Sequence, residues 1–148
     1  MFTRILVGTD GSEPAGRALA AACDLAKTFE AELVLVHTPR PETVAFATGA
    51  IAGYHMVTTM PADEEVRAAA QKVLDEAKAK VSETGCPEPR TEVRRGDPGD
   101  EILALAKDIE ADLIVTGRRG LGNFAGLVMG STSQRVSHLA TCAVLTVP

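Results

Sequence analysis

The chain has 148 residues, 45% of them hydrophobic, which fits a single domain over residues 1–148 with a sizeable core. Its net charge of −5 and its 3% of aromatic residues argue against a nucleic-acid partner, because phosphates demand a basic surface and unpaired bases demand aromatic stacking. No apolar run approaches the ~20 residues that span a bilayer, and the N-terminal stretch lacks a signal-peptide pattern, so we expect a cytoplasmic protein without membrane contact.

The first part of the chain predicts a strand, a helix and a second strand. The apolar run Arg4 to Thr9 ends at the turn signal Asp10-Gly11 and reads as a buried strand. Ser12 can cap the helix that follows, since an acid and a proline occupy its first turn. Residues 32–38 predict the second strand. The apolar positions of the helix recur at helical spacing: Ala15, Ala18, Leu19, Ala22, Ala26 and Phe29.

The middle of the chain predicts a long loop and a second helix. Residues 39–61 are rich in proline and glycine and are too numerous for a tight connection, so they could form a lid. Asp63 is the expected cap of the helix, which should stop by Gly85. Its expected buried face consists of Val66, Ala70, Val73, Ala77 and Val81.

The last part predicts two further helices and three strands. Residues 91–95 form a weak strand, and Asp97 can cap a helix that has Pro98 at its first position. The apolar runs 112–117 and 143–147 predict strands, and a short helix between them should start at Ser131 or Thr132. Alternating strands and helices with nearly continuous apolar strands indicate an α/β, doubly wound, five-stranded parallel sheet with helices on both faces.

The three cysteines give no sign of a disulfide framework. Cys23, Cys86 and Cys142 are odd in number and lack the CxxC spacing. This usage favours reduced thiols in a cytosolic compartment, and no cluster of further ligands accompanies the thiols to suggest a metal site.

The segment "GRRGLGNFAGLVMGST", residues 117–132, is the strongest functional signal. It follows a strand directly, so it should lie at the carboxyl edge of the sheet, where open α/β sheets bind ligands. It ends at a helix N-terminus, whose free N–H groups and dipole favour an anion. Glycine allows the backbone to approach a phosphate closely. The alternative interpretation is a surface loop in which Ser131 merely caps the helix.

Two familiar phosphate-binding patterns fail here. No lysine precedes Ser131, which excludes GxxxxGK[ST], and the glycines at 120, 122 and 126 do not give GxGxxG. The spacing Gly117-x2-Gly120-x9-Gly130-Ser131 instead resembles the ATP-binding branch of the universal stress protein family. The resemblance spans the chain, from "ILVGTDGSE" through "GDPGDEILALAKDIEADLIVTG" to the terminal strand. It implies a Rossmann-like fold of the adenine nucleotide alpha hydrolase type.

The resemblance also implies which residues bind the nucleotide. The first strand should end in a turn that contacts the nucleoside, and Gly8 stands there in place of the usual proline. Thr38 should contact adenine through its backbone, after His37, which we interpret as a strand-end residue rather than a catalytic one. The complete expected set is Gly8, Thr9, Asp10, Thr38, Gly117, Arg118, Arg119, Gly120, Gly130, Ser131 and Thr132.

The charged residues of this set have two expected roles at the phosphates. Asp10 could help to hold Mg²⁺, although one carboxylate makes a weak site without phosphate oxygens; the alternative is a plain turn residue that bonds its own backbone. Arg118 or Arg119 could pair with phosphate through a planar guanidinium, and the alternative is a solvated arginine in surface ion pairs.

The resulting hypothesis is a cytoplasmic regulatory or stress-response protein that binds ATP, or AMP or ADP in its place. Members of the family commonly dimerise through the last strand, here Ala143 to Val147, and an unpaired apolar edge agrees with that. One alternative is a slow ATPase that depends on Mg²⁺, without the parts of a fast phosphoryl-transfer enzyme. The other is a protein-interaction module that binds no nucleotide.

Overall fold

Five parallel strands form one sheet in the order β3-β2-β1-β4-β5. The computed structural model describes residues 1–40, 62–121 and 129–148. The strands are β1 (Arg4–Gly8), β2 (Glu32–His37), β3 (Arg90–Val93), β4 (Leu113–Gly117) and β5 (Ala143–Val147). Chain order reverses between β1 and β4, which makes their carboxyl ends the switch point of a doubly wound α/β fold. The predicted fold class is confirmed. Positions 41–61 of the expected lid lie outside the described residues.

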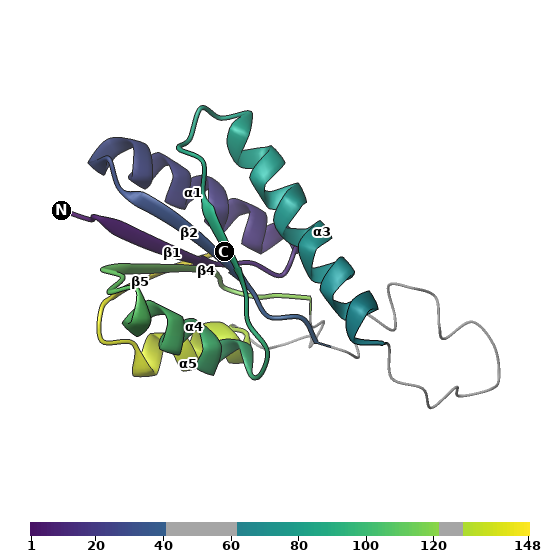
Figure 1. Ribbon diagram of the computed structural model, residues 1–148. Coiled ribbons are helices and arrows are strands. Elements are labelled where there is room, and N and C mark those ends of the chain that lie inside the picture. The colour runs from purple at the N-terminus through teal and green to yellow at the C-terminus, as the bar shows by residue number, and fades with distance from the viewer. Residues whose placement is uncertain (41–61, 122–128) are drawn as a thin grey trace.

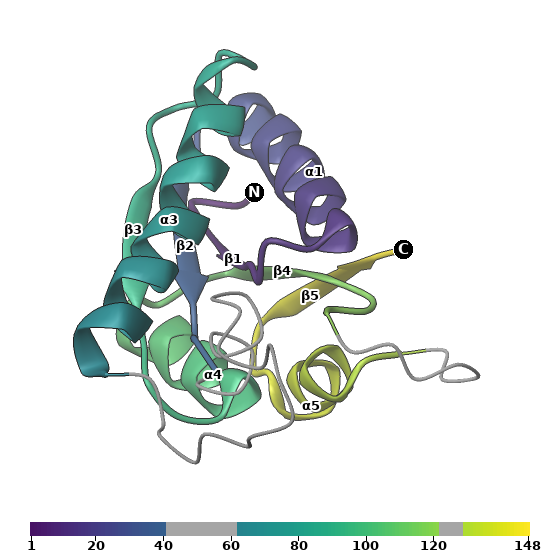
Figure 2. The same cartoon turned by 90° about the vertical axis from the view of Figure 1, so that its right-hand side faces the viewer.

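Helices cover both faces of this sheet. They are α1 (Glu13–Phe29), α3 (Asp63–Ser82), α4 (Pro98–Asp108) and α5 (Ser131–Leu139). In both views the sheet lies between the pair α1 and α3 and the pair α4 and α5 (Figures 1 and 2). None of the helices in the described ranges is long and apolar enough to cross a membrane.

Strand side chains alternate between two apolar layers. Ile5 and Val7 of β1 pack toward α1 and α3, while Leu6 between them packs toward α4 and α5. All three are fully buried. Because both faces of the central strands are covered, β1 and β4 have nearly continuous apolar sequences, as parallel sheets require.

The helix caps agree with the sequence in two cases out of three. The Ser12 side chain accepts from the Ala15 N–H, and the Asp97 side chain accepts from the Asp100 N–H. The prediction for α3 is wrong: Ala62 is the N-cap residue and makes no side-chain cap bond, while Asp63 is the first helical residue. Acidic residues also favour the first turn because of the helix dipole, so three consecutive acids do not fix the cap position.

The buried face of α3 also differs by one position from the prediction. Leu74 is buried, whereas the predicted Val73 is half-buried. Val66, Ala70, Ala77 and Val81 are buried as expected. A helix repeat of 3.6 residues places Leu74 four residues after Ala70 on the same stripe, beside Val73 at its edge.

The expectation of unpaired cysteines is contradicted, because Cys23 and Cys86 form a disulfide. Cys23 lies on α1, and Cys86 lies in the connection between α3 and β3. Their Cα atoms are 5.7 Å apart although 63 residues separate them along the chain. The packing of α1 against α3 brings the two segments together, and no local spacing in the sequence signals such a contact. Cys142 remains a free thiol.

Candidate functional site

The carboxyl ends of β1, β2 and β4 meet at one edge of the sheet. Gly8, the last residue of β1, is in register with Val36 of β2 on one side and with Thr116 of β4 on the other. A Cβ added to Gly8 would lie 2.7 Å from Ile102 Cδ1 of α4, so this position has little room for a side chain. The segments that follow these strands therefore lie side by side at the switch point (Figure 2).

Asp10 links two of these segments. One carboxylate oxygen accepts from the Ser12 N–H at 2.9 Å, within the turn between β1 and α1. The other accepts from the Leu121 N–H at 3.1 Å, across the edge of the sheet. The first bond is the turn interaction that a plain turn residue would make. The second places the carboxylate against the glycine-rich segment, and the role of Asp10 toward a nucleotide stays a prediction.

The two ends of the glycine-rich segment are joined by the Arg118 backbone. Its carbonyl accepts from the Gly130 N–H at 2.7 Å and from the Ser133 hydroxyl at 2.8 Å, and its N–H donates to the Val147 carbonyl at 2.6 Å. Residues 117–120 and 130–132 are thereby neighbours. Residues 122–128 between them lie outside the described residues.

Helix α5 begins directly after this segment. Gly130 is the N-cap residue, and as a glycine it has no side chain that could form a cap hydrogen bond. The first turn carries no acidic residue. The first N–H groups of a helix lack partners within the helix and carry the positive end of its dipole, so an uncapped start suits an anion. Ser131 and Thr132 place their hydroxyls in this first turn.

Two glycines of the motif are required by packing within the chain itself. A Cβ on Gly120 would overlap the Asp10 carboxylate. A Cβ on Gly117 would lie 2.9 Å from the Pro14 backbone carbon and 3.0 Å from the Ala15 nitrogen, at the start of α1. Gly130 differs, because a Cβ there would make ordinary contacts of 3.4 Å or more. Gly117 and Gly120 therefore allow the segment to pack closely against α1 and the Asp10 turn, whereas Gly130 is not required by packing.

The charged side chains differ in their surroundings. Arg118 and Arg119 are exposed, as a solvated arginine would be, and their role toward phosphate stays a prediction.

No group of three or more His, Cys, Asp or Glu side chains in the described ranges is arranged to hold a metal ion. A Mg²⁺ ion near Asp10 would therefore take most of its oxygen ligands from phosphates and water.

His37 and Thr38 lie at the same edge, at the end of β2. The His37 Nδ1 donates to the Thr9 carbonyl at 2.7 Å. Burial lowers the pKa of His37, while the bond to Thr9 and the charge of Asp10 act in the opposite direction. The imidazole is therefore neutral at pH 7, and Nδ1 carries its proton because a carbonyl can only accept. The Thr38 hydroxyl is buried and has no hydrogen-bond partner within residues 1–40, 62–121 and 129–148.

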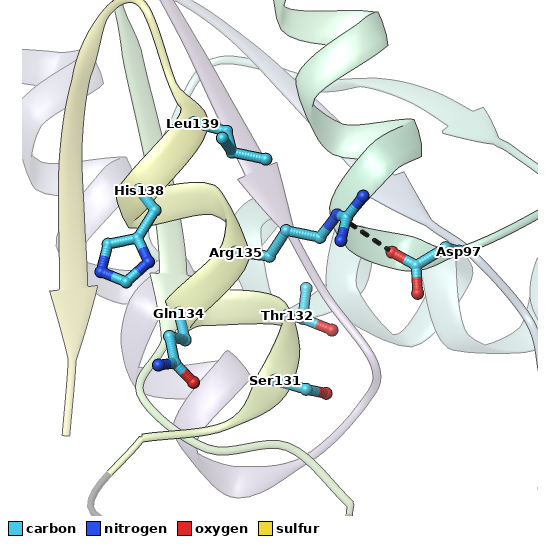
Figure 3. Close-up of a pocket in the computed structure, with 7 residues that line it drawn as sticks. All are labelled: Asp97, Ser131, Thr132, Gln134, Arg135, His138 and Leu139. Atoms are coloured by element: carbon cyan, nitrogen blue, oxygen red, sulfur yellow. Dashed lines mark ion pairs between the residues drawn. The ribbon is translucent and has the colours of Figure 1, made fainter.

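An open cavity of about 370 Å³ runs along α5 from its first turn (Figure 3). Of the predicted residues it takes in only Ser131 and Thr132, so it extends away from Asp10 and Thr38. Its other lining residues are Asp97, Gln134, Arg135, His138 and Leu139. Arg135 lies 2.6 Å from Asp100 and 4.0 Å from Asp97, so its charge is already paired with the start of α4.

Sequence reasoning missed Ser133, which fixes the closed segment. Its side chain is buried, and its hydroxyl donates to the Arg118 and Gly130 carbonyls. The signal available was a third hydroxyl residue in the first turn of the predicted helix, directly after the motif. Nothing in the sequence pointed to the Arg118 carbonyl as its partner.

Comparison with known proteins agrees with this architecture. A model of the universal stress protein family matches residues 1–148. Universal stress protein YxiE of Bacillus subtilis is 39% identical over 150 residues, covering 99% of each chain. The structure of universal stress protein UspA from Lactobacillus plantarum has a TM-score of 0.77 at 26% identity and covers 99% of this chain and 98% of that one.

A second solved structure is a universal stress protein in complex with cAMP. It has a TM-score of 0.72 at 26% identity, over 99% of this chain and 97% of that one. The resemblance inferred from the glycine motif is thus confirmed at the level of the family. On its sheet order, its full-length family match and its relatives, the chain belongs to the universal stress protein family.

Proposed function

We propose that this protein binds ATP, or another adenine nucleotide, at the carboxyl ends of β1 and β4 and acts in the cytoplasm as a regulatory or stress-response protein. One observation carries the proposal: the Arg118 carbonyl closes the glycine-rich segment onto an uncapped α5 N-terminus, next to the Asp10 turn. A closed backbone segment at a free helix start is suited to a chain of phosphates. The complex of a structural neighbour with cAMP supports an adenine ligand.

The proposed roles follow the positions of the residues. The phosphates lie over the α5 N-terminus and bond Ser131 and Thr132, while Gly117, Gly120 and Gly130 allow the segment to approach. Thr38 contacts the base from the end of β2. Three residues at the end of β1 and two exposed arginines complete the site: Gly8, Thr9, Asp10, Arg118 and Arg119. Mg²⁺, when present, is held by phosphate oxygens with Asp10 as its protein ligand.

The protein is further proposed to form a homodimer through β5. This strand lies at the edge of the sheet and consists of Ala143–Val147, without a charged residue. Leu145 at its centre is 36% exposed. An uncharged edge strand with free backbone groups favours pairing with a second copy.

The sharpest test replaces Ser131 by aspartate. A carboxylate in the first turn should stabilise α5 by about 0.3–1 kcal/mol through the helix dipole, yet repel a phosphate at the same N-terminus. Calorimetric titration with ATP, AMP and cAMP, with and without Mg²⁺, should show saturable binding by the wild type. Binding by Ser131→Asp should be at least about tenfold weaker at unchanged or higher thermal stability.

Ser131→Asn is the matched control, because it has nearly the shape of aspartate without its charge. It should bind ATP much more tightly than Ser131→Asp does. If nucleotide-free wild-type protein takes up no adenine nucleotide, the proposal is wrong. If Ser131→Asp binds ATP as the wild type does, the phosphates do not lie at α5.

A further inference from the structure

The hydrogen bonds between β1 and β2 change in kind at the edge that faces the site. Up to that point the pairing is regular, with Gly8 opposite Val36 and the Thr9 N–H donating to the Val36 carbonyl at 2.9 Å. In a parallel ladder the next bond would run from the Thr38 N–H to the Thr9 carbonyl. The His37 side chain reaches that carbonyl instead, with Nδ1 at 2.7 Å.

The imidazole is held firmly for this task. His37 is 9% exposed, and its own carbonyl accepts from the Arg94 N–H of the segment after β3 at 3.1 Å. Its neighbour Val36 packs toward α4 and α5, so His37 faces the opposite side of the sheet. The side chain is therefore a fixed, neutral donor that lies on the side of the sheet that α1 and α3 cover.

A continuous set of contacts leads from this donor to the glycine-rich segment. Thr9 directly precedes Asp10, whose carboxylate accepts from the Ser12 and Leu121 N–H groups. The position of the Thr9 carbonyl thus sets the position of the Asp10 turn. On the other side, the buried Thr38 hydroxyl has no partner among the described residues, a property it shares with Thr116 at the end of β4, and buried hydroxyls are normally paired.

We propose that His37 is a positioning residue of the nucleotide site: its imidazole holds the Thr9 carbonyl, which fixes the Asp10 turn and leaves Thr38 free to bond the ligand with its hydroxyl as well as its backbone. This inference rests on the proposed nucleotide binding. It assigns to the Thr38 hydroxyl a hydrogen bond to the base of the nucleotide.

Two amide variants test the donor position. The side-chain nitrogen of His37→Asn falls where Nδ1 lies, whereas that of His37→Gln falls near Nε2. Affinity for AMP, measured by calorimetry at about pH 8, where His37 is neutral, should stay within about threefold of wild type in His37→Asn. It should fall about tenfold in His37→Gln, the loss expected for one hydrogen bond. Equal affinities in the two variants would overturn the inference.

Thr38→Val tests the second half of the proposal. It keeps the shape of the side chain and removes a hydroxyl that has no partner in the part of the chain that the structure describes, so thermal stability should hold or rise. Affinity for AMP should fall about tenfold. Unchanged affinity would show that the hydroxyl does not meet the ligand. Absence of any binding by the wild type would instead remove the proposed function, which separates the two failures.

Discussion

Asp10 shows how one residue can satisfy two interpretations of a sequence. The turn signal Asp10-Gly11 predicted a carboxylate that bonds its own backbone, and the bond from the Ser12 N–H is of that kind. The bond from the Leu121 N–H, 111 residues away, is not local. The resemblance to a family put Asp10 and the glycine motif in one expected nucleotide site, but local sequence carries no information on a partner as distant as Leu121.

Gly120 should be needed because of Asp10. A Cβ at this position would overlap the carboxylate and break its bond to Leu121. Gly120→Ala should therefore lower the free energy of unfolding by about 1 kcal/mol, measured by urea denaturation. In an Asp10→Ala background the same change should cost almost nothing, since the overlapping group is gone. An equal cost in both backgrounds would show that Gly120 is required for another reason.

His37 should give the folded protein a pH-dependent stability. Burial lowers the pKa of His37 in the folded state below its usual 6.5, so the unfolded chain binds the proton more readily. The unfolded state then carries more protons as pH falls, and the free energy of unfolding decreases below about pH 6.5. Urea denaturation between about pH 7.5 and about pH 5.5 should show this decrease. His37→Asn should flatten it, and an unchanged slope would point to other groups.

At the scale of elements, the sequence specified helices better than their faces and ends. Ser12 and Asp97 could be identified as caps because a proline-containing first turn follows each of them. Both cap hydrogen bonds are present. The Asp63 prediction failed because a carboxylate is also favourable one position later. The prediction of Val73 instead of Leu74 as a buried residue of α3 has a similar cause. The two residues are adjacent, and both lie within the width of an apolar helix face.

Gly16 in α1 offers a stabilising change. It lies inside the helix, and a Cβ added there would meet no atom within 4 Å. Gly16→Ala should therefore raise the free energy of unfolding by up to about 1 kcal/mol, because alanine loses less backbone entropy in a helix. Gly99→Ala in α4 is the matched control with the opposite sign, since its Cβ would lie 2.8 Å from Arg135 Cδ. Similar denaturation midpoints for the two variants would contradict this account.

For the whole molecule, the sequence predicted the layers and left the long-range bonds open. Alternating apolar strands and amphipathic helices specify a parallel sheet, and its switch point predicts where a ligand would bind without any knowledge of side-chain contacts. The closure through Arg118, the His37 bond to Thr9 and the pairing of Cys23 with Cys86 join segments far apart in the chain. Such contacts depend on packing geometry, which no motif encodes. The ligand roles of the site residues accordingly remain predictions.

The two edges of the sheet differ in a way that predicts how the molecule associates. The β3 edge carries Arg90 and Glu92, which form an ion pair at 2.7 Å, and charged edge strands resist pairing with another copy. The β5 edge has no charge. Wild-type protein should therefore sediment as a dimer, and Leu145→Lys should give monomers because two lysines would meet near the two-fold axis of the paired strands.

Val93→Lys is the matched control for this experiment. Val93 is 38% exposed on the β3 edge and Leu145 is 36% exposed on the β5 edge, so the two substitutions bring the same charge to equally accessible apolar positions. Sedimentation velocity should find Val93→Lys dimeric and Leu145→Lys monomeric, both with the helical content of the wild type. If the wild type is monomeric at every concentration, or if Leu145→Lys stays dimeric, β5 is not the contact. Monomers from Val93→Lys alone would move the interface to the opposite edge of the sheet.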